Sequence, residues 1–169
     1  SGHHGRTAGG RPGTALAGPE VVTAALGLSR PAVTRGADSR WDADLMLRVA
    51  TGISDEARAM NNTWLARGKR NLYQGLVFWS PNINIVRDPR WGRGQETYGE
   101  DPFLTGALGT AFVKGMQGSD PRYLKTVATP KHYAVHSGPE PLRHVFDAKV
   151  SETDLRQTYL PAFRDLVVN

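Results

Sequence analysis

Hydrophobic residues recur at helical spacing over residues 42–66. Acidic residues stand near the start of this stretch, and the apolar positions follow at steps of three and four: Leu45, Val49, Ile53, Ala57, Met60 and Trp64. The spacing predicts an amphipathic helix with one buried face. Gly52 lies inside the pattern and is expected to weaken the helix locally.

The same period returns over residues 101–118, where Pro102 suits a first helical turn and Gly118 suits an end. A last helix is predicted over residues 151–168. It should begin at Ser151 as N-cap, and Pro161 should kink it or divide it in two.

Two apolar stretches without helical period lie between these helices. Residues 75–85 are rich in β-branched and aromatic side chains and predict a buried strand that frays at Pro81. Residues 125–135 predict a second strand, and residues 21–28 are compatible with a short helix or a short strand.

The order helix, strand, helix, strand, helix predicts an α/β fold with parallel strands joined by crossover helices. Two architectures fit: an open doubly wound sheet, or part of a closed (β/α)8 TIM-type barrel that would hold about three βα units of the eight. Both place binding residues beyond the C-terminal ends of the strands.

Composition narrows the class of protein. The 169 residues suffice for a core, no apolar run is long enough to cross a membrane, and the absence of cysteine excludes disulfides and thiolate metal sites. The net charge is +5, and residues 1–40 hold five arginines against two acids. This basic stretch has no lysine and no aromatic residue for stacking on bases, so nucleic-acid binding is a poor match.

Charged residues gather in two loops, each directly after a predicted strand. In residues 87–101, three arginines recur at every third position: Arg87, Arg90 and Arg93. One interpretation is a structural lattice of ion pairs. The other is that an arginine joins Lys131 and His132, after the second strand, in a cleft that holds the hydroxyls of a polyol or the oxygens of a phosphate.

Further alternatives concern metals, nucleotides and aromatic contacts. The chain lacks a phosphate-binding G-x-x-x-x-G-K-[ST] motif, and its histidines match no zinc spacing: His132, His136 and His144. No metal site and no cofactor are therefore expected. Three aromatic residues suit either a flat sugar face or the core: Trp79, Trp91 and Tyr98.

Two long motifs resemble glycoside hydrolase family 3, in the branch that holds β-glucosidases and β-xylosidases. They are WSPNINIVRDPRWGRGQETYGEDPFLTG and KHYAVHSGPEPLRHVFDAKVSETDLRQTYLPAF. With the helix before them, the resemblance covers residues 41–169. Residues 1–40 diverge from the family and form a separate segment, either disordered or read from a shifted reading frame.

The resemblance implies a TIM-type barrel that hydrolyses O-glycosyl bonds with retention and releases terminal β-D-glucose or β-D-xylose. It also implies that Arg93, Lys131 and His132 donate hydrogen bonds to the hydroxyls of the sugar, and that Trp79 lines the same subsite. The neighbouring charges, among them Arg90, would then form a scaffold that fixes Arg93.

The family uses an aspartate nucleophile in a motif like S-D-W and a later glutamate as acid/base, and neither motif occurs in this sequence. We therefore expect no catalytic residue here, a partner in the C-terminal part of the same protein, and a periplasmic or secreted location for the whole. One alternative is an inactive carbohydrate-binding chain. Another is a catalytic pair formed by Glu96 and Asp101.

Overall fold

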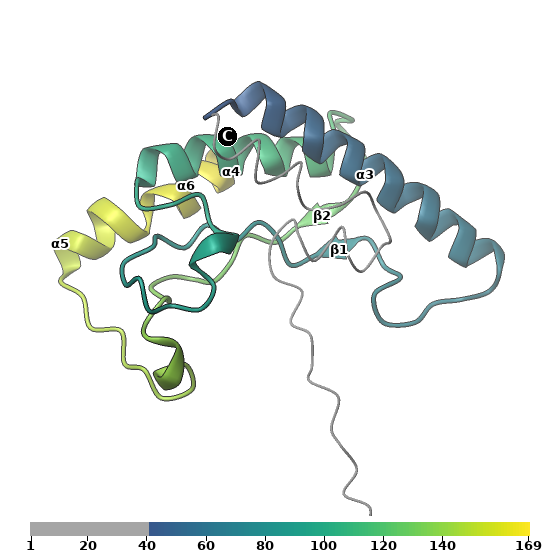
Figure 1. The fold of residues 1–169 in the computed structure, drawn as a ribbon. Coiled ribbons are helices and arrows are strands. Elements are labelled where there is room, and N and C mark those ends of the chain that lie inside the picture. The colour runs from purple at the N-terminus through teal and green to yellow at the C-terminus, as the bar shows by residue number, and fades with distance from the viewer. Residues whose placement is uncertain (1–40) are drawn as a thin grey trace, which may run out of the picture.

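The structure is a computed structural model, and it describes residues 41–169 (Figure 1). The segment expected over residues 21–28, and the whole separate segment 1–40, lie outside the described residues. Within them, α-helices alternate with short strands, which confirms the α/β class. No helix in this part of the chain combines the length and the apolarity that crossing a bilayer would require.

Helix α3 (Ala43–Ala66) confirms the first predicted helix. The side chain of Asp42 caps it by accepting a hydrogen bond of 2.9 Å from the backbone N–H of Leu45. Its buried face is turned slightly from the predicted one. The buried apolar side chains of α3 are Met46, Ala50, Ile53 and Ala57. The other four predicted positions pack at the margin of the core: Leu45, Val49, Met60 and Trp64.

The two strands are far shorter than predicted. Strand β1 (Val77–Phe78) pairs in parallel with β2 (Val127–Ala128), with Val77 opposite Val127 and Phe78 opposite Ala128. Pairing stops before Pro81, which has no N–H to donate, and resumes as one parallel bridge between Asn82 and Lys131. The predicted strands 75–85 and 125–135 are therefore mostly extended loops that run side by side.

Helix α4 (Pro102–Gln117) connects the two strands and is bounded as the sequence indicates. Asp101 caps its start through a hydrogen bond of 2.6 Å from the N–H of Leu104, and Pro102 occupies the first turn. Gly118 ends it with φ of 75°, a conformation that glycine adopts without steric cost.

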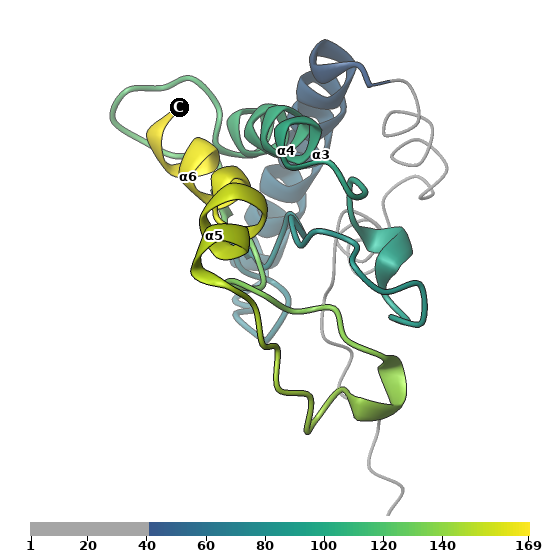
Figure 2. The same ribbon diagram turned by 90° about the vertical axis from the view of Figure 1, so that its left-hand side faces the viewer.

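The last predicted helix is divided, as expected from Pro161. A short α5 (Glu152–Asp154) leads into the π-helical turn η3 (Leu155–Tyr159) and then into α6 (Pro161–Val168). Ser151 is the N-cap, accepting 3.0 Å from the N–H of Asp154. In Figure 2, α6 lies beside α4, and Figure 1 shows α3, α4 and α6 together on one side of the strands.

The core lies between these helices and one face of the strand pair. Phe78 and Ala128 point into it, whereas Val77 and Val127 on the opposite face are 62% and 38% exposed. Helices α3 and α4 approach closely at Gly115, whose carbonyl accepts a buried hydrogen bond of 2.8 Å from the hydroxyl of Ser54. A sheet with helices on one face alone leaves its other face available for a site or for further chain.

Candidate functional site

The two loops that follow β1 and β2 meet in a cavity of about 480 Å³ beyond the C-terminal ends of the strands. The first loop includes the 3-10 turn η1 (Gly94–Glu96), and the second includes the 3-10 turn η2 (Glu140–Leu142). The cavity brings all four predicted sugar-binding residues together with four others: Trp79, Arg93, Thr129, Lys131, His132, His136, Arg143 and His144.

Arg93 is only 8% exposed and forms the central ion pair of the site. Its Nη2 lies 2.7 Å from Glu96 Oε2, and its Nε lies 3.0 Å from Oε1 of the same carboxylate. Its Nη1 points instead toward His132, with Nη1 and Nε2 3.3 Å apart. Glu96 thus neutralises and orients the guanidinium of Arg93, and the Nη1 atom of Arg93 remains directed at His132.

Lys131 and His132 both line the cavity although they are adjacent in sequence. The backbone does not continue as a regular strand between them, and their peptide bond is cis. Lys131 is 9% exposed, and burial together with the nearby Arg93 lowers its pKa to about 8, although Glu96 opposes the shift.

His132 is held by Asn84, which is 1% exposed. Asn84 Oδ1 lies 2.9 Å from both the backbone nitrogen and the ring Nδ1 of His132. Burial, and next the positive charge of Arg93, lower the pKa of His132 from 6.5 to about 3. The same causes, in the same order, lower the pKa of His136, whose ring centre lies 4.8 Å from that of His132. Both imidazoles are therefore neutral near pH 7.

The aromatic residues divide between the two expected environments. Trp79 is 63% exposed and lines the cavity, whereas Trp91 and Tyr98 are buried. Trp91 packs edge-on against the ring of His136, with ring centres 5.7 Å apart. Trp79 alone of these three is available to a ligand, and the other two belong to the support of the site.

The scaffold around Arg93 differs from the expected lattice of charges. Arg90 points into solvent and pairs only with Asp88, at 2.8 Å, which lowers the pKa of that carboxyl to about 2. Arg87 contacts the aromatic rings of Phe146 and Tyr159, with its guanidinium 5.8 Å from each ring centre. Of these charged neighbours, Glu96 contacts Arg93.

Hydrogen bonds to the backbone also join the two loops. The N–H of Glu140 donates 3.1 Å to the carbonyl of Arg90, and the Glu140 carboxylate accepts 3.2 Å from the N–H of Gly92. A Cβ at position 92 would lie 2.9 Å from that carboxylate, so a larger residue there would displace the end of the Glu140 side chain. The hydroxyl of Ser137 adds a buried bond of 3.0 Å to the carbonyl of Ile85.

Sequence reasoning did not identify Asn84, and it considered His136 only as a metal ligand. The available signal for Asn84 was an asparagine inside an apolar run, a polar group that burial obliges to find partners. Those partners lie 48 and 50 residues away in sequence, beyond the reach of a local pattern.

Neither a metal ion nor a catalytic carboxylate has an evident place among the described residues. Residues 41–169 contain no group of three or more histidine and acidic side chains arranged to hold a metal. The described lining of the cavity includes no carboxylate. Glu96 pairs with Arg93 and Asp101 caps the start of α4, and neither of these two acids lines the cavity.

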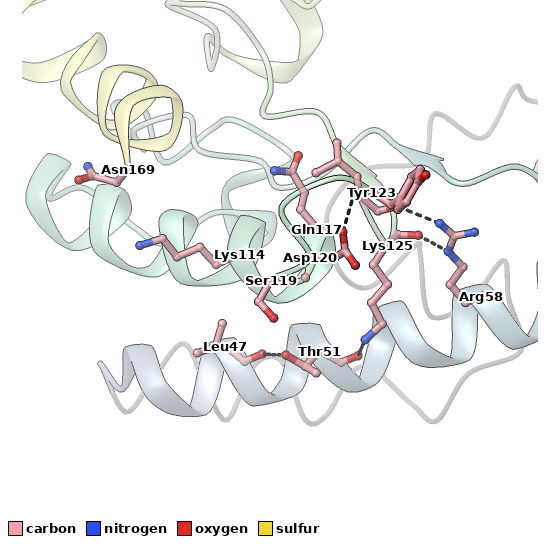
Figure 3. Close-up of a pocket in the computed structure, with 12 residues that line it drawn as sticks. Leu47, Thr51, Arg58, Lys114, Gln117, Ser119, Asp120, Tyr123, Lys125 and Asn169 are labelled. Carbon is pink, nitrogen blue, oxygen red and sulfur yellow. Dashed lines mark hydrogen bonds between the residues drawn. The ribbon is translucent and has the colours of Figure 1, made fainter.

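A larger hollow, of about 1000 Å³, lies between α3, the end of α4 and the loop that leads into β2 (Figure 3). Its polar side chains already serve the fold. Arg58 donates to the carbonyls of Leu124 and Lys125, and Lys125 pairs with Asp55 at 2.6 Å. This hollow lies at the N-terminal side of the strands, where parallel α/β folds do not keep their sites.

Known proteins are similar to this chain in sequence and in fold. The sequence model of the Glycosyl hydrolase family 3 N terminal domain matches residues 36–169. Xylan 1,4-beta-xylosidase of Xylanibacter ruminicola is 48% identical over 136 residues, covering 78% of this chain and 16% of that protein. Beta-xylosidase/alpha-L-arabinofuranosidase 1 of Medicago sativa subsp. varia is 40% identical over 164 residues, covering 94% of this chain and 20% of that protein.

Solved structures of β-xylosidases and β-glucosidases are also similar to this chain. A GH3 exo-beta-xylosidase in complex with a xylobiose aziridine probe has a TM-score of 0.65 and 35% identity, covering 79% of this chain and 17% of that one. Beta-glucosidase 3B from Thermotoga neapolitana has a TM-score of 0.61 and 34% identity, covering 77% and 16%. The chain spans about a fifth or less of the length of these relatives. It belongs to glycosyl hydrolase family 3, in whose N-terminal domain its described residues lie.

Proposed function

We propose that this chain binds the terminal sugar of a β-glycoside in an enzyme that hydrolyses the glycosidic bond with retention. The observation that carries the proposal is the convergence of Arg93, Lys131 and His132 on one cavity beyond the ends of two parallel strands. Seven of the eight residues that line the cavity have polar or charged side chains, and the eighth, Trp79, is 63% exposed. Hydrogen-bonding groups beside an aromatic ring suit a sugar, which carries hydroxyls around an apolar ring face.

The arrangement of helices supports an arc of a closed barrel. Helices α3 and α4 cover one face of the strand pair, and Val77 and Val127 stand exposed on the other. A doubly wound sheet would carry helices on both faces, whereas a barrel carries them only outside. We assign residues 41–169 to about three βα units of the eight, with Val77 and Val127 directed toward the barrel interior. Residues 1–40 are assigned to a separate segment.

Retaining hydrolysis needs two carboxylates about 5 Å apart, one as nucleophile and one as acid/base. We assign both to chain outside the described residues, because the described lining of the cavity holds none. Arg93 and Lys131 would then hold ring hydroxyls away from the reacting carbon. That placement suits the chemistry, because the transition state develops positive charge near the anomeric carbon and a cation there would oppose it.

The named relatives favour a β-xyloside as substrate. The proteins of Xylanibacter ruminicola and Medicago sativa subsp. varia carry β-xylosidase in their names, at 48% and 40% identity. The β-glucosidase of Thermotoga neapolitana is 34% identical. The second name of the Medicago protein, α-L-arabinofuranosidase, makes an α-L-arabinofuranoside the second candidate.

The test is turnover of aryl glycosides by the protein that carries this chain. We expect kcat/KM to be highest for the aryl β-D-xyloside, lower for the β-D-glucoside and measurable for the α-L-arabinofuranoside. Proton spectra taken during the first turnovers of the xyloside should show the β-anomer of xylose, since retention keeps the configuration. No turnover of any of the three, or initial release of the α-anomer from the xyloside, would overturn the proposal.

A further inference from the structure

Asn84 is a buried asparagine whose amide is oriented by its own contacts. Its Nδ2 donates to two backbone carbonyls, those of His132 at 2.8 Å and Ala134 at 3.2 Å. Its Oδ1 accepts from the backbone N–H of His132 at 2.9 Å. Exchanging oxygen and nitrogen would turn all three bonds into clashes of like groups, so Oδ1 is the acceptor that faces the imidazole.

The orientation of this amide fixes the proton on the ring of His132. Nδ1 lies 2.9 Å from Asn84 Oδ1, an oxygen that only accepts, so Nδ1 carries the hydrogen. A neutral imidazole then has a lone pair on Nε2. Nε2 accordingly accepts from Arg93 Nη1 at 3.3 Å, and arginine has nothing but donors to offer.

The charges around the ring maintain its neutral state. Arg93 faces Nε2, Lys131 and His136 flank the ring on its own loop, and Arg143 lies along the same cavity. Burial has the largest effect, and Arg93, His136, Lys131 and Arg143 add to it, so that the pKa of His132 falls to about 3. Two carboxylates of the two loops are themselves paired, Glu96 with Arg93 and Glu140 with Arg143.

We propose that Asn84 is a positioning residue that holds His132 as the Nδ1–H tautomer, so that Nε2 accepts, from Arg93 as in the structure or from a ligand hydroxyl that takes the place of this 3.3 Å contact, and does not donate. This deepens the proposed function and rests on it for the identity of the ligand. The cavity then combines the donors Arg93 and Lys131 with an acceptor at Nε2. A sugar hydroxyl both donates and accepts, so it satisfies this set, whereas a fully ionised phosphate would present lone pairs to the Nε2 lone pair.

The tautomer can be measured without any assay of activity. In the protein that carries this chain, labelled with 15N-histidine, the His132 signals are identified by their loss in His132→Gln. At neutral pH we expect the chemical shift of a protonated nitrogen at Nδ1 and of an unprotonated one at Nε2. A proton on Nε2, or on both nitrogens, would overturn the assignment of the tautomer even if the enzyme hydrolyses xylosides.

Kinetics test the role of Asn84 separately. Asn84→Ala should lower kcat/KM for the aryl xyloside by about tenfold or more, as loss of a buried hydrogen bond implies. Asn84→Asp keeps the shape of the side chain but places a negative charge beside Nδ1, which favours the imidazolium. It should therefore add a second acidic limb to the pH profile of kcat/KM, at higher pH than the one that a carboxylate nucleophile gives the wild type.

A double variant separates positioning of His132 from damage to the fold. In His132→Gln the further change Asn84→Asp should add no such limb, because no imidazole remains to titrate. Melting temperatures identify variants that fail to fold. If the double variant fails, the pH profile of Asn84→Asp alone tests the role of Asn84. Persistence of the limb in the double variant would show that the new aspartate itself titrates and would overturn the role of Asn84. An inactive wild type with the expected tautomer would instead count against the proposed glycosidase.

Discussion

At the scale of single residues, Arg93 and Arg90 lie three positions apart in one loop and have opposite environments. Arg93 is buried, paired with Glu96 and directed at His132. The side chain of Arg90 is 72% exposed and pairs with Asp88 on the surface. The spacing alone marked both as members of one arginine series, and the resemblance to the family singled out Arg93. Only the fold of the loop decides which guanidinium enters the cavity, because the contacts of Arg93 include a residue 39 positions away.

This contrast gives a matched pair of variants. Arg93→Ala should lower kcat/KM for an aryl xyloside by at least about tenfold, because a lost charged hydrogen bond is worth about 1.5–3 kcal/mol. Arg90→Ala should change kcat/KM less than about twofold and leave the melting temperature nearly constant, since exposed ion pairs contribute little. Equal losses of kcat/KM in the two variants would contradict the separate roles.

The low pKa of His132 also makes stability depend on pH. The unfolded chain takes up a proton at His132 below about pH 6.5, whereas the folded chain does so only near pH 3. The unfolded state therefore binds more protons in that window, and the free energy of unfolding falls as the pH is lowered through it. His132→Gln should make this decline shallower, which denaturant titrations at a series of pH values will measure. An unchanged slope would count against the buried neutral imidazole.

At the scale of elements, helix boundaries were predictable and strand lengths were not. Ser151, Pro102, Gly118 and Pro161 act where they stand, because caps, first turns and kinks depend on local backbone chemistry. Strand length depends on a partner, and pairing is limited to two residues of each strand before Pro81 and to one bridge after it. An apolar run therefore predicts burial better than it predicts a ladder of hydrogen bonds.

The contact of α3 with α4 provides a test at two glycines. At Gly115, a Cβ would lie 2.6 Å from the Cβ of Ala50 and 2.6 Å from the carbonyl oxygen of Leu47. Gly115→Ala should therefore lower the free energy of unfolding by about 1–3 kcal/mol, as overpacking does. Gly52 is the control, because a Cβ added there would meet no atom within 4 Å outside the backbone of its own helix. Gly52→Ala should raise the free energy of unfolding by about 0.5–1 kcal/mol. Equal effects in denaturant titrations would refute the close approach.

At the scale of the whole molecule, the described residues leave one sheet face and both strand edges uncovered. Val77, Trp79 and Tyr133 are 62%, 63% and 79% exposed, and β1 and β2 pair only with each other in residues 41–169. Large exposed apolar side chains and unpaired edges favour association with other chains. The order of elements predicted the α/β class, while the open face became visible only in three dimensions.

We therefore predict that the isolated 169-residue chain associates with itself. Sedimentation velocity should show species larger than a monomer, and a dye that binds apolar surface should fluoresce strongly. Val77→Lys with Val127→Thr, two changes on the exposed face, should reduce both signals, since charge and polarity there oppose association. A monomeric sedimentation profile together with a sharp cooperative melt would contradict the prediction that the uncovered face causes self-association.

The central claim is that the cavity formed by the two loops binds the hydroxyls of the terminal sugar. The most direct measurement is kcat/KM of the wild type and of Lys131→Met, in the protein that carries this chain, on an aryl β-xyloside and its single deoxy derivatives. The variant keeps the apolar stem and should lose about ten- to hundredfold on the parent xyloside. We predict that this loss shrinks for the one deoxy derivative that lacks the hydroxyl bound by Lys131. The same fold loss on the parent and on every deoxy derivative would contradict the claim.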